Sequence, residues 1–407
     1  MSTLPTVEVE QPNTSSVVAS GVKPLLICLP SLASDAASAV IAELRSVFPT
    51  EAMMVAMPDQ VGERPATEDL PHLIPYTRPR GNGAWVLNAE DYLSAASLAE
   101  QRGAQSVLLL GTDVGSLDPV ALRTIQTALA AGADLALPRY RTAPDDGLVN
   151  SALLYPLTRA LFATDIRFPL PLDAGLSLRM LTRLANASER LGGSPESGLQ
   201  WPVAEASIAG FSVREVEGGA RTLPQPGEGD LSELFPAVTS SLFADIEAKA
   251  TYWQRARALP ARRSPVARAA DNVAHNETTD EIRSLIEGYR IAFTNLREIW
   301  SLVLPPQSLL ALKKLSQSAP EAFVYSPNLW ARTVYDFALA YHLRTLNRGH
   351  LLGSFTPLYL SWVASFLRNG SGDVNIETEL LESTAYAFEQ EKSYLVSRWR
   401  WPDRFNP

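Results

Sequence analysis

An apolar run that ends in an acidic residue is the clearest candidate for chemistry in the sequence. The stretch "LLLGTD", residues 108–113, brings Asp113 to the end of a run of leucines, directly after Thr112. Divalent Mg²⁺ or Mn²⁺ takes hard oxygen ligands, usually one or two carboxylates together with phosphate and water. Asp113 is therefore a candidate ligand of a divalent cation, and simple termination of a strand is the alternative. Asp118, which precedes Pro119, is interpreted as the cap of the next helix.

A second motif joins arginine to glycine. In "RPRGNGAW", residues 78–85, Arg78 and Arg80 stand next to Gly81 and Gly83. Glycine lets a backbone approach a phosphate closely, and arginine offers a pair of parallel donors to it. The motif is thus a candidate for binding the phosphates of a nucleotide, with an ordinary surface turn as the alternative. It is not a dinucleotide-binding fingerprint, because the third glycine is absent from its expected place.

A third motif is a polar loop that follows a strand-like run. The stretch "RYRTAPDDGLVN", residues 139–150, contains Arg141, Asp146, Gly147 and Asn150. Such a loop could hold a small hydroxylated, anionic acceptor. The alternative is a solvated turn, for which Asp-Asp-Gly is favourable.

Composition excludes several classes of protein. The 407 residues are 46% hydrophobic and 19% charged, as expected for a globular protein, and the length favours two domains. The net charge of −9 argues against nucleic acid as the main partner. Cys28 is the only cysteine, which excludes an internal disulfide and fits a reducing cytoplasm. We expect no membrane span, since no apolar run reaches about 18 residues.

Other catalytic arrangements find no support. The four histidines show no metal-ligand spacing, and neither a serine nucleophile elbow nor an HExxH motif is present.

The elements that would position these motifs alternate between strand and helix. Apolar runs predict strands at 23–31, 52–59, 105–113 and 134–140, with helices at 35–48, 90–103 and 118–133. This alternation predicts an α/β fold with a mostly parallel, doubly wound sheet, whose ligands lie at the carboxyl ends of the strands. Beyond residue 160, segments 163–177 and 210–229 are rich in Pro and Gly and predict loops beside short strands.

The pattern also suggests a division of the chain. From residue 280 onward the sequence predicts helices at 280–304, 328–346, 357–369 and 375–400. We expect a flexible tail at 1–22, an α/β domain at 23–257, a linker or clasp at 258–279 and an all-helical domain at 280–407.

Several segments together resemble GT-A glycosyltransferases of the glucosylglycerate and mannosylglycerate synthase kind, which are family 2-like bacterial enzymes. The match covers most of residues 23–400, in order. The segments that carry the resemblance are "LLICLPS", "RGNGAW", "LLLGTD", the most specific stretch 137–177, "GLQWPVAEASIAGFSVREVEGGAR", and the helical "LWARTVYDFALAYH" with "TPLYLSWVASF".

The resemblance implies a role for each motif. In that family, the two carboxylates of a DxD motif and a later histidine bind the metal that holds a sugar-nucleotide diphosphate. Asp113 matches the second of these carboxylates, and Asp173 matches an acidic residue near the reacting centre, hence a catalytic candidate. The remaining roles divide into donor contacts by Arg78, Arg80, Gly81, Gly83 and Thr112, and acceptor contacts by Arg141, Asp146, Gly147 and Asn150.

The sequence departs from the family pattern on the donor side. Gly111 stands where relatives usually carry Asp, and Asn82 where they carry a basic residue. Ala33-Ser34 replaces Asn-Glu, and the metal histidine is expected near Leu223. Each departure removes a group that would contact the donor or its metal.

Two functions are therefore open. The first is an active transferase that moves a hexosyl group from a nucleotide sugar to a small hydroxylated acceptor such as glycerate, with retaining or inverting chemistry undecided. The second is a GT-A-fold protein that has lost donor binding and serves as a binding or regulatory subunit. A Rossmann-type oxidoreductase is a distant third, and a homo-oligomer is not excluded.

Overall fold

The structure is a computed structural model of the chain. It describes residues 24–32, 36–48, 53–58, 73–76, 87–142, 147–190, 199–221, 228–257, 279–370 and 373–402. The expected tail at 1–22, and all but the last residue of the expected linker at 258–279, lie outside these ranges.

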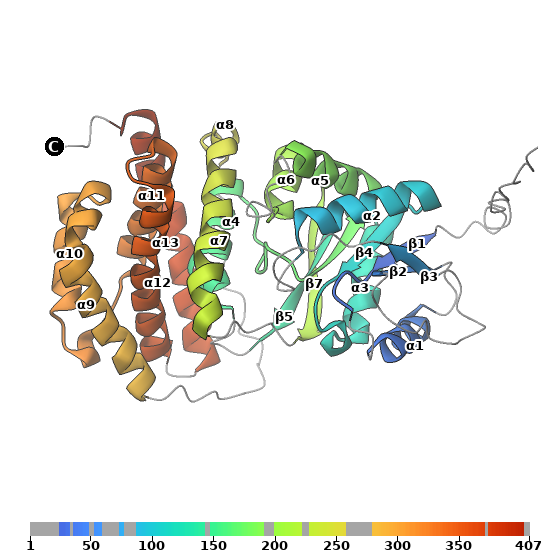
Figure 1. The fold of residues 1–407 in the computed structure, drawn as a ribbon, viewed down its shortest axis with the longest axis horizontal. Coiled ribbons are helices and arrows are strands. Elements are labelled where there is room, and N and C mark those ends of the chain that lie inside the picture. The colour runs from blue at the N-terminus through green and yellow to red at the C-terminus, as the bar shows by residue number, and fades with distance from the viewer. Residues whose placement is uncertain are drawn as a thin grey trace, which may run out of the picture.

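A seven-stranded mixed sheet forms one part of the molecule (Figure 1). Its strand order is β3-β2-β1-β4-β6-β5-β7, and only β6 runs antiparallel to its neighbours. The strands are β1 Leu25–Cys28, β2 Met53–Pro58, β3 Leu73–Tyr76, β4 Ser106–Leu110, β5 Leu135–Arg141, β6 Asp173–Ser177 and β7 Val213–Ala220.

Helices cover both faces of the sheet, which explains why its strands are apolar throughout. On β4, Leu108 and Leu110 join the core under α1 (Ala37–Val47) and α3 (Pro119–Ala130). The intervening Val107 and Leu109 face the opposite core, under the helices α2 Ala89–Arg102, α5 Leu178–Arg190 and α6 Pro202–Ala209. A strand buried on both faces reads as a continuous apolar run.

A helical region stands beside the sheet (Figure 1). Its core joins the C-terminal helices to α4, α7 and α8. The helices of this region are α4 Tyr155–Phe162, α7 Glu228–Ala248, α8 Ala250–Trp253, α9 Thr279–Val303, α10 Pro306–Ser316, α11 Pro327–Leu343, α12 Arg348–Gly370 and α13 Val374–Arg400. The predicted architecture, an α/β sheet of mostly parallel strands followed by an all-helical region, is confirmed. The boundary at residue 257 stays a prediction.

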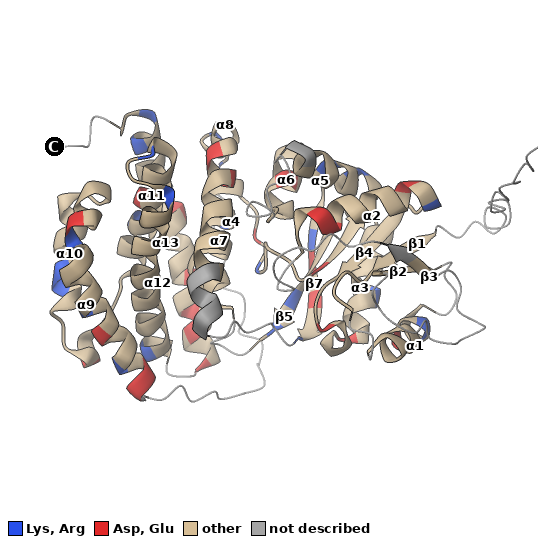
Figure 2. Cartoon of the chain, in the orientation of Figure 1, with Lys and Arg blue, Asp and Glu red and all other residues tan. Residues whose placement is uncertain are grey.

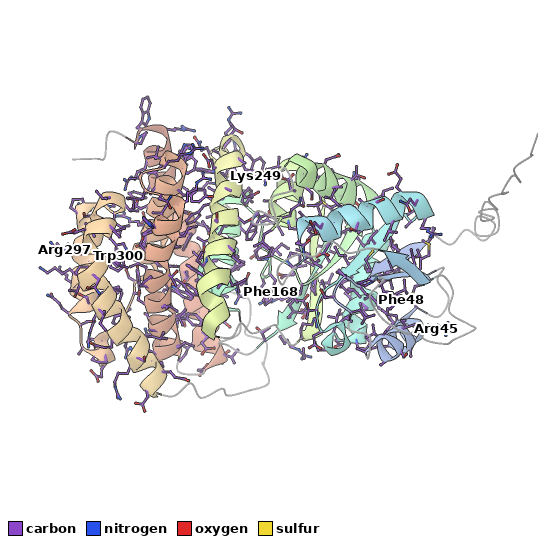
Figure 3. All side chains as sticks on the ribbon, in the orientation of Figure 1. Arg45, Phe48, Phe168, Lys249, Arg297 and Trp300 are labelled. Atoms are coloured by element: carbon purple, nitrogen blue, oxygen red, sulfur yellow. The ribbon has the colours of Figure 1, made fainter. Side chains whose placement is uncertain are left out.

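Buried tryptophans tie the helical core together. Trp300, labelled in Figure 3, donates from Nε1 to the carbonyl of Ser354 at 2.9 Å. Trp330 donates to the carbonyl of Ala152 at 2.8 Å, in the short π-helix Asn150–Leu154 that precedes α4. This bond connects the C-terminal helices to the segment that leaves the sheet after β5. None of the helices in the described ranges combines the length and apolarity that a membrane span requires.

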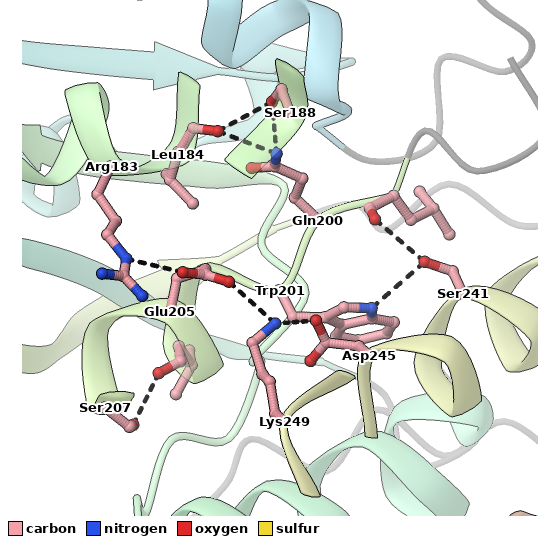
Figure 4. A network of polar contacts seen from close by, with 12 residues as sticks. Arg183, Leu184, Ser188, Gln200, Trp201, Glu205, Ser207, Ser241, Asp245 and Lys249 are labelled. Carbon is pink, nitrogen blue, oxygen red and sulfur yellow. Dashed lines mark hydrogen bonds and ion pairs between the residues drawn. The ribbon is translucent and has the colours of Figure 1, made fainter. Parts of the chain in front are cut away.

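A polar network fastens the helices that cover the sheet to the helical region (Figure 4). Glu205 on α6 accepts from Arg183 on α5 at 2.8 Å and from Lys249, just beyond α7, at 3.0 Å. Lys249 also contacts Asp245 on α7. Burial raises the pKa of Asp245 to about 6, although Lys249 acts in the opposite direction. Its Oδ2 is buried without a hydrogen-bond partner.

We expect Asp245 to make stability depend on pH. Because its pKa is raised in the folded state, the fold binds this proton more tightly than the unfolded chain between about pH 4 and 6. The stabilisation is present at low pH and is lost as pH rises through about 6. Relative to Asp245→Asn, the wild type should lose roughly 2–3 kcal/mol of unfolding free energy between pH 4.5 and 7.5.

Urea unfolding at a series of pH values measures this difference. Asp280→Asn, a change at an exposed carboxylate on α9, serves as the matched control and should parallel the wild type. Parallel curves for the wild type and Asp245→Asn would show that Asp245 does not take up the proton.

Candidate functional site

Four of the segments that carry polar side chains meet at one edge of the sheet. β4, β5 and β7 run in the same direction, so their carboxyl ends lie at the same edge. The antiparallel β6 begins at this edge, where Asp173 pairs with Leu110. The sequence of residues 163–177 predicts only loops beside short strands. The reversal of one strand is what brings Asp173 to the end of β4.

Asp113 lies on a tight turn just beyond β4. Its backbone is left-handed, with φ of 55°, a conformation in which Asp is among the more tolerated residues. A short 3₁₀ helix, Val114–Ser116, follows it, and its side chain is exposed. Further along, Asp118 caps α3 by accepting from the Val120 N–H at 2.8 Å, so the predicted helix cap is confirmed. The two acidic residues of this stretch thus have different surroundings.

Arg221, directly after β7, donates hydrogen bonds to this turn. Its Nη2 donates to the carbonyl of Thr112 at 2.6 Å, and its Nη1 donates to the carbonyl of Asp113. Nη1 also donates to Oγ of Ser116 at 2.7 Å. One guanidinium therefore fixes three residues of the turn that presents the Asp113 carboxylate.

Asp173 neutralises the charge of Arg221 inside the protein. Arg221 Nε lies 3.0 Å from one carboxylate oxygen of Asp173, and Nη2 lies 3.2 Å from the other. Both side chains are 0% exposed. Although burial disfavours the cation, the carboxylate of Asp173 outweighs it and raises the pKa of Arg221. The guanidinium and the carboxylate thus face each other inside the protein.

Two further donors complete the surroundings of Asp173. The Tyr140 hydroxyl donates to Oδ2 at 2.7 Å, and the Gly111 N–H donates to Oδ1 at 3.1 Å. Burial and the negative charge of Asp173 raise the pKa of Tyr140 well above its usual range, so the phenol stays protonated. Asp173 was predicted to be catalytic. The structure shows it as a fully buried carboxylate that accepts from four donor atoms, and its catalytic role stays a prediction.

The absence of a carboxylate at position 111 has a packing reason. A Cβ at Gly111 would lie 2.6 Å from the carbonyl oxygen of Leu172, well inside van der Waals contact. The close approach of these two backbones occurs just beyond the last pair of β4 and β6, Leu110 with Asp173. Only glycine fits here, so the first carboxylate of a DxD motif has no room.

The predicted acceptor residues are partly placed. Arg141 ends β5 with an exposed side chain, and Gly147 has a φ of 67°, which glycine tolerates without strain. Asn150 is buried and donates from Nδ2 to the carbonyl of Arg167 at 2.6 Å. Figure 2 shows the basic residues of β5 on the side of the sheet nearest the helical region. Five predicted residues lie outside the described ranges: Arg78, Arg80, Gly81, Gly83 and Asp146.

Sequence reasoning missed Arg221, Tyr140 and Arg167. Arg221 and Tyr140 contact Asp173 from 48 and 33 residues away, so local patterns give no sign of the pairing. The only sequence signal was weak: an arginine directly after a predicted short strand, at the strand end where open α/β sheets in general bind ligands.

Asp113 is an exposed carboxylate just beyond the carboxyl end of β4. Within the described ranges, no three His, Cys, Asp or Glu side chains gather as a closed metal site requires. A cation at this edge would therefore be held by Asp113 together with oxygens of the ligand and water, as Mg²⁺ often is when bound with phosphates. The residues fit such a site only with a phosphate ligand present.

Comparison with known proteins gives a distant structural likeness. No protein-family model and no curated protein sequence matches the chain. Glucosyl-3-phosphoglycerate synthase from Mycobacterium tuberculosis, in complex with Mg²⁺ and UDP, is 13% identical over 55% of this chain and 78% of its own, with a TM-score of 0.35. Mannosyl-3-phosphoglycerate synthase from Rubrobacter xylanophilus is 12% identical over 56% and 76%, with a TM-score of 0.37. A likeness at this level does not assign an activity.

Proposed function

We propose that this chain transfers a hexosyl group from a nucleotide sugar to a small hydroxylated acceptor such as glycerate. One observation supports this most: an exposed carboxylate, Asp113, stands at the carboxyl edge of the sheet on a turn that Arg221 holds through three contacts. Ligands of open α/β sheets bind at this edge. A rigid turn is what a donor site needs to position a diphosphate.

The residues take the following roles in the proposal. Asp113 holds a divalent cation, Mg²⁺ or Mn²⁺, which would offset the charge on the leaving diphosphate. Thr112, with the predicted Arg78, Arg80, Gly81 and Gly83, contacts the donor. Asp173 and Arg221 keep the turn in place. The acceptor contacts proposed are Arg141, Asp146, Gly147 and Asn150.

A second function is favoured by the packing at Gly111. Because Leu172 leaves no room for a second carboxylate, the chain could be a GT-A-fold protein without donor binding that acts as a binding or regulatory subunit. The two proposals differ in whether a nucleotide sugar binds at all.

Thermal unfolding with added donors separates the two proposals. We expect UDP-glucose, GDP-glucose or GDP-mannose to raise the melting temperature in the presence of Mn²⁺. A ligand that binds only the folded state at about 100 times its Kd adds about 2.7 kcal/mol of stability. No shift with any of the three donors at millimolar concentration would reject the transferase and favour the second proposal.

Asp113→Ala tests the role of the carboxylate. We expect it to abolish the Mn²⁺-dependent part of the shift while costing the free protein only about 1–2 kcal/mol, because Ala adopts the left-handed backbone at this position less readily than Asp. Asp118→Ala is the matched control from the same stretch. Loss of its helix cap should cost about 1 kcal/mol of stability yet leave donor binding intact. Full Mn²⁺-dependent binding by Asp113→Ala would remove this residue from the site.

A further inference from the structure

Arg167, on the segment between α4 and β6, is an arginine with an unusual environment. Its Nη2 donates to Oγ of Ser151 at 3.2 Å, while Nη1 is buried and has no hydrogen-bond partner. No carboxylate in the described ranges lies within ion-pair distance of its guanidinium. By contrast, Arg159, Arg221 and Arg398 each have a carboxylate oxygen within 3.0 Å. Buried polar groups are nearly always satisfied, so an unpartnered donor points to an absent partner.

The guanidinium of Arg167 lies near two aromatic rings. Its central carbon is 5.2 Å from the ring centroid of Tyr155 and 5.6 Å from that of Phe168. Phe168 is labelled in Figure 3. Aromatic contacts engage the flat faces of arginine, whereas its N–H groups lie in the plane and match the paired oxygens of a carboxylate or phosphate.

The acidic groups around Arg167 already have other partners. Glu215 on β7 accepts from the backbone N–H of Arg167 at 2.6 Å and lies 3.8 Å from Arg139. Asp165 and Glu382 both have a carboxylate oxygen within hydrogen-bond distance of the Tyr155 hydroxyl, at 2.9 and 2.8 Å, and Glu382 also accepts from Arg159. The nearby carboxylates therefore do not satisfy the guanidinium of Arg167 by hydrogen bonds.

A second arginine lies close enough for its charge to act on Arg167. Arg139 on β5 is 49% exposed, and its charge acts on Arg167. Burial lowers the pKa of Arg167 to about 10, and Arg139 acts in the same direction, so Arg167 remains charged at neutral pH. An anion bound by Arg167 would supply the missing hydrogen-bond partner, and its negative charge would offset the repulsion from Arg139.

We propose that Arg167, assisted by Arg139, binds a small oxyanion, either a carboxylate or a phosphate group. The inference that Arg167 binds an oxyanion does not depend on the proposed sugar transfer. The further assignment of this oxyanion to the acceptor molecule rests on the proposed function. Asn150, a proposed acceptor contact, donates to the carbonyl of Arg167 and so fixes the segment that carries the guanidinium. The acceptor would then be an acid or a phosphate ester, and uncharged polyols would be excluded.

Calorimetric titration of the full-length protein with inorganic phosphate tests the site. We expect measurable binding of phosphate and of glycerate, and none of glycerol. Arg167→Gln should weaken phosphate binding at least tenfold, and Arg139→Gln should weaken it several-fold. Arg283→Gln, a change at an arginine that is 63% exposed on α9, is the control and should bind phosphate as the wild type does.

The outcomes separate this inference from the proposed function. Equal phosphate affinity in Arg167→Gln and the wild type, or no phosphate binding by the wild type, would overturn the oxyanion site. If Arg167→Gln does not fold, Arg139→Gln carries the same test, because its side chain is half exposed. Donor-induced thermal shifts should be unchanged in Arg167→Gln. Phosphate binding without any donor binding would reject the transferase and leave the oxyanion site standing.

Competition identifies where the oxyanion comes from. If glycerate displaces bound phosphate, the site is assigned to an acceptor that carries a carboxylate. If glycerate cannot displace bound phosphate, the site is assigned to an acceptor that is a phosphate ester. Both results support an oxyanion site at Arg167.

Discussion

Replacing Arg221 with Met is expected to lower the free energy of unfolding by about 3–5 kcal/mol, the usual cost of leaving one partner of a buried ion pair alone. Asp173 would keep a buried negative charge with only the Tyr140 hydroxyl and the Gly111 N–H as donors. The carbonyls of Thr112 and Asp113 and Oγ of Ser116 would also lose the guanidinium. Urea unfolding measures the loss.

A double-mutant cycle isolates the pair itself. Asp173→Asn removes the charge that Arg221→Met leaves behind, so the double variant should be less destabilised than the sum of the two single variants. Donor binding should fall in Arg221→Met even at temperatures where the protein is folded, because the turn that carries Asp113 loses its anchor. A loss below about 1 kcal/mol, with donor binding intact, would contradict the role given to Arg221.

The second large effect is expected at Gly111. Gly111→Asp would restore the DxD pattern in sequence, yet we expect it to cost at least about 3 kcal/mol and to give no gain in metal binding. The new Cβ would collide with the carbonyl of Leu172, and the new carboxylate would lie beside the buried carboxylate of Asp173. Denaturant unfolding, with and without Mn²⁺, is the measurement.

Two matched variants separate the causes at Gly111. Gly111→Ala carries only the collision and should cost about 1–3 kcal/mol. Gly115→Asp adds a carboxylate to the same turn at a position where a Cβ meets nothing within 4 Å, so its stability should stay close to that of the wild type. A stable Gly111→Asp protein that gains Mn²⁺ binding would show that the missing carboxylate is a free substitution and not a consequence of packing.

The elements were predictable from sequence because their signals are local. The alternating burial of Val107, Leu108, Leu109 and Leu110 follows from a run of apolar residues, and the cap at Asp118 follows from an acidic residue before proline. The antiparallel direction of β6 carries no local signal. It depends on pairing with β4, from which it is separated by α3, β5, α4 and two short helical segments, Val114–Ser116 and Asn150–Leu154.

The candidate site was predictable only where one residue suffices to suggest chemistry. Asp113 was found because a carboxylate follows a strand. The surroundings of Asp173 were not, because Gly111, Tyr140 and Arg221 reach it from 62, 33 and 48 residues away. Burial also changes the meaning of a residue type: an aspartate that sequence suggests as catalytic is, in the fold, the buried partner of an arginine. The predicted roles of the donor and acceptor residues stay predictions.

The central claim is that a sugar is transferred from a nucleotide donor at the edge of the sheet that carries Asp113. Incubating the protein with UDP-glucose, GDP-glucose or GDP-mannose, glycerate and Mn²⁺, and measuring the release of nucleoside diphosphate, tests it most directly. We expect release with one donor, only when glycerate is present, and its loss in Asp113→Ala but not in Asp118→Ala. Release that is equal with and without glycerate, or absent with all three donors, would contradict the claim.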